Sequence, residues 1–168
     1  EACRNWDRLY GGGGTGIGAG VILNGSLDRG PDGLAGELGH MIIEPDGLPC
    51  VCGARGCRET VAAGPAIGTL GKHAAEMDPH SLLRGYSVIT ASSVYEAARH
   101  ADAAALAIAE RVGGYLALAL QQLIMAYGVE CIVLGGGVSS IVDAFVRPLL
   151  AGVARLRAGS VVTRQIVQ

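Results

Sequence analysis

Three cysteines and a histidine in the first half of the chain have the residue types and the spacing of a metal site. The cysteines are Cys50, Cys52 and Cys57, and His40 stands ten residues before the first of them. Thiolates and imidazoles are ligands that zinc prefers, and four of them complete a closed tetrahedral site of the structural kind. Cys50 and Cys52 are too close in sequence to bridge each other comfortably. The spacing therefore predicts a structural zinc ion, with a loop of free thiols as the alternative.

Two acidic residues flank this cluster along the chain. Glu37 stands three residues before His40, and Glu59 stands two residues after Cys57. A metal-bound loop would bring both carboxylates near the imidazole, where they could accept hydrogen bonds from the vicinal hydroxyls of a sugar or polyol. Considered alone, the two acids favour ordinary surface charges or, for Glu59, a charge in the first turn of a helix.

Two glycine-rich segments could bind phosphate groups through their backbone N–H groups. The first precedes a predicted hairpin and not a long helix, so a dinucleotide fold is not indicated. The second follows a predicted buried strand and precedes a helix. Either segment alone is more often only a tight turn, and the presence of two in one small domain raises the nucleotide interpretation to about even with it. The residues are Gly14, Thr15, Gly16 and Gly18 in the first segment and Gly135, Gly136 and Gly137 in the second.

Short apolar runs in the first half predict strands that position these residues. Asn24 and Gly25 suit a two-residue hairpin turn, because both of its positions need a positive φ. Residues 17–23 and 26–28 should therefore pair. Residues 41–43 are a further candidate for a short buried strand.

The second half is predicted to be mostly helical. Ser93 and Glu96 have the spacing of a capping box, which predicts a helix start there. Asp102 suits the N-cap of a long apolar helix over residues 103–127, and Gly128 suits its end.

The remaining elements alternate between helix and strand. A mixed helical segment over residues 58–77 should be interrupted near Gly64, because Pro65 follows it. Residues 130–134 predict a buried strand, and helix follows again to about residue 157. This alternation predicts an α/β architecture.

The composition limits the class of protein. A chain of 168 residues corresponds to one domain or one lobe of a larger protein. The formal net charge of -2 argues against a nucleic-acid-binding surface within these residues. Because no run of eighteen apolar residues is free of charges and glycine clusters, we expect no membrane span.

Taken together, the motifs closely resemble the ROK family, whose name covers repressors, open reading frames and kinases. The resemblance is dense from Gly14 to His40, where GTGIGAG, NG, RG and GELGH occur in order. It continues through PDGLPCVCGARGCRE at residues 45–59 and resumes with IVLGGGV at residues 132–138. The resemblance implies an α/β fold, the C-terminal lobe of an actin-like (ribonuclease-H-like) ATPase with a structural zinc loop at residues 40–59.

The resemblance also implies a role for each motif. It assigns sugar contacts to Glu37, His40 and Glu59, so that His40 would hold zinc with one ring nitrogen and face a sugar hydroxyl with the other. The family's second phosphate loop corresponds to residues 14–18, and its adenosine-side loop to residues 135–137. The implied zinc ligands are His40, Cys50, Cys52 and Cys57. ATP and Mg²⁺ are the implied further cofactors.

Family members also carry an N-terminal lobe with a first phosphate loop, Asp-x-Gly-Gly-Thr, and a catalytic Asp after an Asn. Neither motif is present here, and the chain opens on Glu1, so we expect it to be part of a longer protein and inactive alone. Asp7 lacks the context of the catalytic Asp. Residues 1–10 would be a remnant of the connection between lobes, and residues 11–168 the C-terminal lobe. Residues 11–13 are glycines where the family has an apolar strand, whose start could be frayed or rebuilt.

Three functions fit these observations. The favoured one is a lobe of a glucokinase-like sugar kinase that transfers the γ-phosphoryl group of ATP to a hexose or N-acetylhexosamine. The second is the effector-binding domain of a ROK transcriptional repressor, whose nucleic-acid contacts would lie in an upstream domain. The third, outside the family, is a small zinc-stabilised structural module. The resemblance further implies a cytoplasmic protein, without a membrane partner, that forms a homodimer or tetramer at full length.

Overall fold

The computed structural model describes residues 8–13, 16–129, 131–135 and 142–159. Four strands, two short 3-10 helices and five α-helices follow one another within these residues. In chain order they are β1 (Arg8–Gly13), β2 (Ile17–Leu23), β3 (Ser26–Asp28), η1 (Leu38–His40), α1 (Glu59–Ala62), α2 (Gly64–Met77), η2 (Leu82–Gly85), α3 (Ala91–Arg99), α4 (Ala103–Tyr127), β4 (Cys131–Gly135) and α5 (Val142–Gly159).

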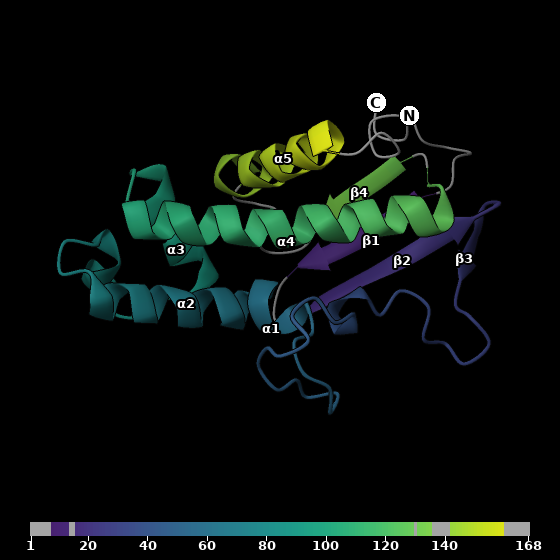
Figure 1. The fold of residues 1–168 in the computed structure, drawn as a ribbon, viewed down its shortest axis with the longest axis horizontal. Helices are drawn as coiled ribbons and strands as arrows, with labels where there is room; N and C mark the ends of the chain where they lie inside the picture. The colour runs from purple at the N-terminus through teal and green to yellow at the C-terminus, as the bar shows by residue number, and fades with distance from the viewer. Residues whose placement is uncertain (1–7, 14–15, 130, 136–141, 160–168) are drawn as a thin grey trace.

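The strands form one sheet in the order β3-β2-β1-β4 (Figure 1). The predicted hairpin is confirmed: β2 and β3 pair antiparallel across Asn24 and Gly25, whose φ values are 50° and 77°. β1 pairs antiparallel with β2 and parallel with β4. The family resemblance left open whether the strand is frayed or rebuilt at the glycines of residues 11–13. These glycines pair with β2 as part of β1.

The long helix α4 is the centre of the helical part. It packs against α2 and α3 in one apolar cluster, around Val94, Tyr95 and Val112. Its C-terminal half contributes Leu123 to a second cluster with Val21 of β2. α5 lies along α4, as Figure 1 shows. By length and composition alone α4 could cross a membrane, but in this fold it packs against helices and strands of the same domain.

Helix boundaries follow local capping chemistry, with one correction. Asp102 caps α4 through a bond from the Ala105 N–H, and Gly128 ends the helix with φ 63°, both as predicted. The capping box predicted at Ser93 and Glu96 is wrong. Thr90 is the N-cap of α3, and Ser93 is the third residue of that box. The Ser93 hydroxyl accepts a hydrogen bond from the Thr90 N–H, as a Glu would at this position, so the helix starts three residues earlier.

The predicted strand at residues 41–43 is also wrong. Only an isolated bridge joins Ile42 to Cys57, and the Ile42 side chain is 54% exposed. The apolar run is held by the backbone of the cysteine loop, since the N–H of Ile43 donates to the carbonyl of Gly56 at 2.8 Å. Apolar residues in so short a run do not by themselves distinguish a buried strand from a loop.

Adjacent glycines on α4 provide a test of the α4–α5 packing. A Cβ atom on Gly113 would lie 2.6 Å from the backbone carbon of Pro148, whereas a Cβ atom on Gly114 would meet nothing within 4 Å. Gly113→Ala is therefore expected to destabilise the fold by about 1–3 kcal/mol, because backbone atoms of α5 must move. Gly114→Ala should instead stabilise it by about 0.5–1 kcal/mol, since alanine favours helix over glycine. Urea unfolding of both variants measures the difference, and equal effects would contradict the close packing.

Candidate functional site

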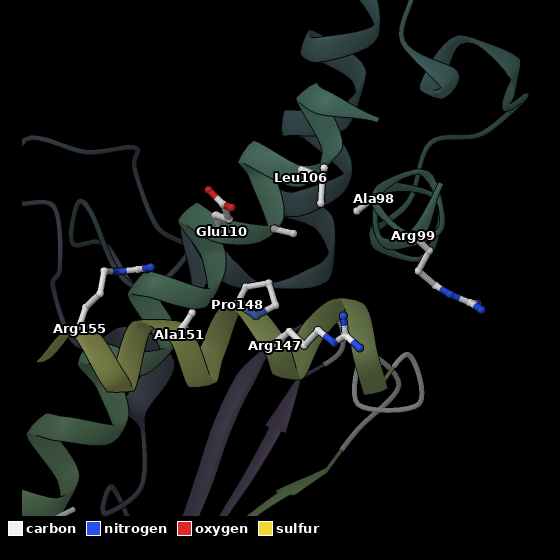
Figure 2. A pocket seen from close by; sticks show the side chains of 9 residues that line it. Ala98, Arg99, Leu106, Glu110, Arg147, Pro148, Ala151 and Arg155 are labelled. Carbon is white, nitrogen blue, oxygen red and sulfur yellow. The ribbon is translucent and has the colours of Figure 1, made fainter. Parts of the chain in front are cut away.

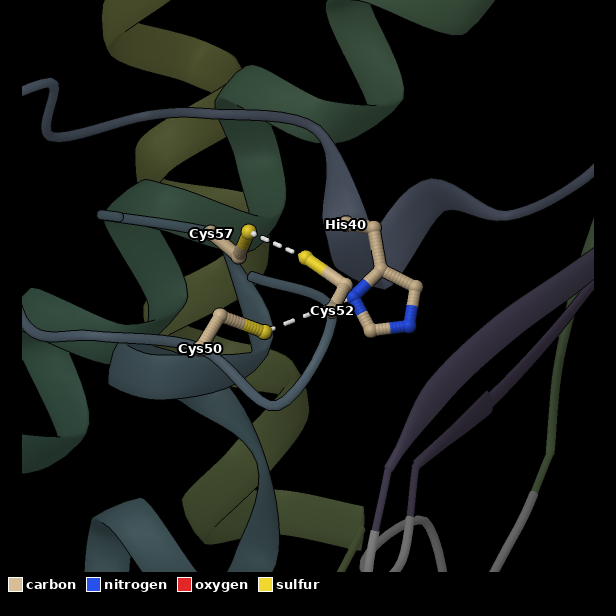
Figure 3. A group of neighbouring side chains, drawn as sticks. All are labelled: His40, Cys50, Cys52 and Cys57. Atoms are coloured by element: carbon tan, nitrogen blue, oxygen red, sulfur yellow. Dashed lines mark hydrogen bonds between the residues drawn. The ribbon is translucent and has the colours of Figure 1, made fainter. Parts of the chain in front are cut away.

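The structure brings together the four residues that the sequence predicts as metal ligands. The ligand atoms of His40, Cys50, Cys52 and Cys57 all lie within 4.8 Å of one another. The Sγ atom of Cys50 is 3.5 Å from Nδ1 of His40, and the Sγ atoms of Cys52 and Cys57 are 3.6 Å apart. Figure 3 shows the three sulfurs facing one ring nitrogen of His40, while the other ring nitrogen points away from them.

The Cys50–His40 and Cys52–Cys57 separations match two edges of a tetrahedral zinc shell. Zn–S bonds of about 2.3 Å and Zn–N bonds of about 2.0–2.1 Å at tetrahedral angles place two sulfurs about 3.8 Å apart and a sulfur and a nitrogen about 3.5 Å apart. An S···S distance of 3.6 Å is far longer than a disulfide bond of about 2.05 Å. The donor set and its spacing therefore fit zinc, with Nδ1 as the nitrogen ligand.

Backbone turns shape the loop that carries the thiols. The N–H of Cys50 donates to the carbonyl of Ala54 at 2.8 Å, and the N–H of Gly53 donates to the carbonyl of Cys50 at 3.0 Å. Gly56 has a φ of 67°, and its α-carbon lies against the carbonyl of Glu44, so no side chain fits there. The loop folds back on itself, so that its sulfurs face one another and His40.

The thiols differ in their environment. Burial, and after it the neighbouring thiols of Cys52 and Cys50, raise the pKa of Cys57 to about 12. Cys52 is exposed, and a bond from the Ala54 backbone, followed by contacts with the other thiols, lowers its pKa. A bound dication would favour thiolates at all three positions, because its charge replaces the missing solvation.

Glu37 and His40 lie on one short turn, η1. Glu37 is the N-cap residue of η1, and its Oε2 atom is 3.9 Å from Nε2 of His40. Since Nδ1 faces the sulfurs, the nitrogen beside Glu37 is the one left for another ligand. The Glu37 side chain is 58% exposed and can reach a small molecule from solvent.

Glu59 also lies beside η1. Its Oε2 atom accepts a hydrogen bond from the N–H of Ile17 at 3.2 Å. The same atom lies 3.4 Å from where a Cβ atom of Gly39 would stand. Gly39 is the middle residue of η1, between Leu38 and His40. The structure therefore places both candidate acids next to η1, with Glu59 also at the start of β2.

The glycine segments meet at one end of the sheet. Gly12 of β1 pairs with Gly18 of β2 on one side and with Gly135 of β4 on the other. Since neighbouring strands lie about 4.8 Å apart, Gly18 and Gly135 are about 10 Å from each other. Gly16 lies at this end as well, because a Cβ atom there would be 2.6 Å from Oε2 of Glu59. The other glycine-segment residues, Gly14, Thr15, Gly136 and Gly137, lie outside the described residues.

Neither of two cavities encloses Glu37, His40 and Glu59 together. One of ≈ 620 Å³ lies between the cysteine loop, α2 and α4, and Glu59 lines it, but Glu37 and His40 do not. Another of ≈ 470 Å³ lies where α3, α4 and α5 meet. Figure 2 shows that its arginines, Arg99, Arg147 and Arg155, point in different directions, so they do not converge on one anion.

Contacts between the cysteine loop and α4 were not predicted from sequence. The Glu44 carboxylate accepts hydrogen bonds from the Tyr115 hydroxyl and from Nη2 of Arg111. The bond from Tyr115, followed by that from Arg111, lowers the pKa of Glu44 against the opposing effect of burial. Arg58 forms a second link, to Gln122. The sequence indicates these contacts only through the spacing of Arg111, Tyr115 and Gln122. Intervals of four and seven residues place the three side chains on one face of a helix.

Comparison with known proteins identifies the class to which this fold belongs. The ROK family model matches residues 9–164. The chain therefore belongs to the ROK family, and the third alternative, a zinc module outside the family, is excluded. A glucokinase from Halalkalibacterium halodurans is 38% identical over 141 residues, which are 81% of this chain and 43% of that protein. The chain thus spans about two fifths of the length of this relative.

Two solved structures show the same fold. A ROK family glucokinase from Streptomyces griseus, solved with glucose and AMPPNP, superposes with a TM-score of 0.83 at 30% identity, over 92% of this chain and 52% of that one. A ROK family transcriptional regulator, homologous to the E. coli MLC protein, superposes with a TM-score of 0.82 at 29% identity, over 96% of this chain and 40% of that one. The predicted α/β lobe of an actin-like ATPase is confirmed.

Proposed function

We propose that this chain is the sugar-binding and nucleotide-facing lobe of a ROK sugar kinase. Joined to an N-terminal lobe, it would take part in transferring the γ-phosphoryl group of ATP to a hydroxyl of a hexose or N-acetylhexosamine. The observation that carries the proposal is the position of Glu59, whose carboxylate lies beside η1 and also beside Gly16 and Ile17 of the first glycine segment. A sugar hydroxyl held there would lie close to bound phosphates.

In this proposal the cysteine loop is a structural zinc site. His40 Nδ1 and the three sulfurs of Cys50, Cys52 and Cys57 hold the ion, which supplies rigidity and takes no part in the reaction. Zinc on Nδ1 fixes the orientation and tautomer of the His40 ring, so that Nε2 faces outward beside Glu37. The loop then sets the backbone position of Glu59, two residues after the last thiolate.

Three side chains would bind the sugar. Glu37 and Glu59 accept hydrogen bonds from hydroxyl groups, and His40 forms one through Nε2. Charge-assisted hydrogen bonds of this kind are worth about 1.5–3 kcal/mol each. None of the described carboxylates is proposed as the general base, since the family resemblance assigns that role to an Asp in the N-terminal lobe.

The two glycine segments would bind the nucleotide. Backbone N–H groups in residues 14–18 would bind the phosphates, except that of Ile17, which donates to Glu59. Residues 135–137 would bind the adenosine side. ATP supplies the transferred group, and Mg²⁺ neutralises charge on its phosphates. Glycine-rich segments let the backbone approach a phosphate closely, and the pairing of Gly18 and Gly135 with Gly12 supports a single nucleotide site.

The direct test is phosphoryl transfer by the protein expressed from its complete reading frame. We expect ATP-dependent phosphorylation of at least one sugar from a panel of glucose, N-acetylglucosamine, N-acetylmannosamine, mannose and fructose. Sugar-dependent ADP formation in a coupled assay measures it, with contaminating hexokinase excluded by a Glu59→Gln preparation made in parallel. If the protein binds one of these sugars but transfers a phosphoryl group to none of them, the result would instead favour a ROK repressor.

The second candidate is a ROK repressor that senses a sugar or sugar phosphate. The observation in its favour is the close superposition on the transcriptional regulator. Both candidates share the sugar site and the zinc loop, and both imply a cytoplasmic protein. The sequence upstream distinguishes them: a kinase needs Asp-x-Gly-Gly-Thr and an Asn-Asp pair, and a repressor needs a basic helix-turn-helix segment of about 80 residues. We favour the kinase, because both glycine segments are retained.

A further inference from the structure

Arg58 is a buried cation at the centre of the candidate site. It stands between Cys57 and Glu59 and is 1% exposed. Within the described part of the chain, no acidic side chain forms an ion pair with it. Burying a charge without a partner costs free energy unless hydrogen bonds compensate. An arginine in such a place therefore needs an explanation from its hydrogen bonds.

The hydrogen bonds of Arg58 join three separate segments. Its Nη1 donates to the carbonyl of Leu38 at 2.8 Å, and its Nη2 donates to Oε1 of Gln122 on α4 at 2.7 Å. Its backbone N–H donates to the carbonyl of Met41 at 3.0 Å. The side chain and backbone thus tie the residue to both ends of η1, while the guanidinium also reaches the central helix.

The first of these bonds ends inside the turn that carries Glu37 and His40. Leu38 follows Glu37 directly, and its carbonyl is held from the segment that carries Cys57 and Glu59. One guanidinium therefore fixes the distance between the two candidate sugar-binding segments. The bond to Gln122 holds that arrangement against α4, which is anchored in the apolar core.

The remaining nitrogen of Arg58 indicates that stability alone does not account for this residue. Its Nε is buried and has no hydrogen-bond partner among the described atoms. A buried donor without a partner costs about 1–3 kcal/mol. Local violations of this kind are typical of sites where geometry matters more than stability.

We propose that Arg58 is a positioning residue for sugar recognition, holding η1 and the Cys57–Glu59 segment in register through Leu38 and Gln122. This inference depends on the proposed function, in which Glu37, His40 and Glu59 bind the sugar. Arg58 does not touch the sugar. It acts by keeping the acceptors of the two segments at the separation that one sugar ring requires.

The experiment compares variants of the protein expressed from its complete reading frame. Arg58→Met keeps a long unbranched side chain and removes every side-chain hydrogen bond, and Arg58→Lys keeps one donor group. Gln122→Leu removes one of the two side-chain bonds and is the milder variant if Arg58→Met fails to fold. Arg99→Met, on α3 and exposed, is the matched control. Calorimetric titration with the sugar of highest affinity in the panel, together with zinc content and melting temperature, provides the readouts.

We expect Arg58→Met to weaken sugar binding at least tenfold with zinc retained, Arg58→Lys to recover part of the affinity, and Gln122→Leu to lose a smaller part. The control should bind as the wild type. Sugar affinity within twofold of wild type in folded Arg58→Met and Gln122→Leu, with only the melting temperature lowered, would overturn the proposal. Loss of zinc from folded Arg58→Met would overturn it too, because Arg58 would then hold the metal loop and not the register.

A Glu59→Gln variant separates this inference from the proposed function. If Glu59→Gln weakens sugar binding and the Arg58 variants do not, the positioning role fails and the proposed function stands. If Glu59→Gln also leaves sugar binding unchanged, the proposed sugar site is wrong, and the positioning role fails with it.

Discussion

Cys57→Ser is expected to remove the metal from the protein and to weaken sugar binding with it. Cys57 is fully buried and is the ligand nearest in sequence to Glu59. A serine hydroxyl is a poor zinc ligand, and the remaining three ligands cannot close the tetrahedron. Structural zinc sites have apparent binding free energies of about 10–16 kcal/mol in small peptides, so the loss should be the largest single effect in this domain.

Metal analysis after dialysis against a mild chelator measures this effect. The wild type should retain one zinc per chain, and Cys57→Ser should retain almost none. Cys131→Ser is the matched control, because Cys131 lies on β4 and is not part of the cluster. Equal zinc content in the wild type and in Cys57→Ser would contradict the ligand assignment.

Glu59→Gln is expected to weaken sugar binding at least tenfold while leaving zinc in place. Glutamine has the same shape and keeps an oxygen that can accept the hydrogen bond from the Ile17 N–H, so the local structure should survive. What is lost is the negative charge, and a hydrogen bond to a charged group is worth about 1.5–3 kcal/mol, roughly twice a neutral one. A carboxylate that accepts from two sugar hydroxyls would therefore lose about 1.5–3 kcal/mol in all, which corresponds to at least tenfold in the dissociation constant.

Glu37→Gln should also weaken sugar binding, since Glu37 stands beside Nε2 of His40, which points away from the sulfurs. Glu76→Gln, an exposed acid on α2, should change nothing. Calorimetric sugar titration with parallel zinc analysis measures all three variants. If neither Glu37→Gln nor Glu59→Gln changes sugar affinity in the folded, zinc-loaded protein, the two acids are only surface charges.

Elements with local causes were predictable from the sequence. The β2–β3 hairpin depends on two adjacent positions with positive φ, which Asn24 and Gly25 supply. α4 depends on Asp102 at one end and Gly128 at the other. The metal cluster belongs to the same category, because Cys50, Cys52 and Cys57 lie within one short loop.

Features that depend on tertiary contacts were not predictable. Arg58 bonds to residues 20 and 64 positions away, so nothing in its neighbours along the chain indicates that it is buried. The run at residues 41–43 is apolar but partly exposed, because backbone bonds to the cysteine loop hold it and only Ile43 packs against the core. Thr90 and Ser93 both carry a hydroxyl that can cap a helix. In the fold Ser93 is only 6% exposed and lies inside α3, so Thr90 is the N-cap. The sequence alone does not show which of the two residues is buried.

The convergence of the two glycine segments also required the sheet topology. By its sequence alone, each segment is typical of a tight turn. The pairing of β1 with both β2 and β4 places Gly18 and Gly135 on either side of Gly12. A parallel pairing between the first and last strands cannot be read from local patterns, because a long helical connection separates them.

Zinc-edge X-ray absorption on protein purified without added metal tests the central claim most directly, since the positions of His40 and Glu59 both depend on the metal loop. We predict one zinc per chain with three sulfur ligands at about 2.3 Å and one nitrogen ligand at about 2.0–2.1 Å. A shell dominated by oxygen, or a disulfide between any two of Cys50, Cys52 and Cys57 in protein that still binds sugar, would contradict the account.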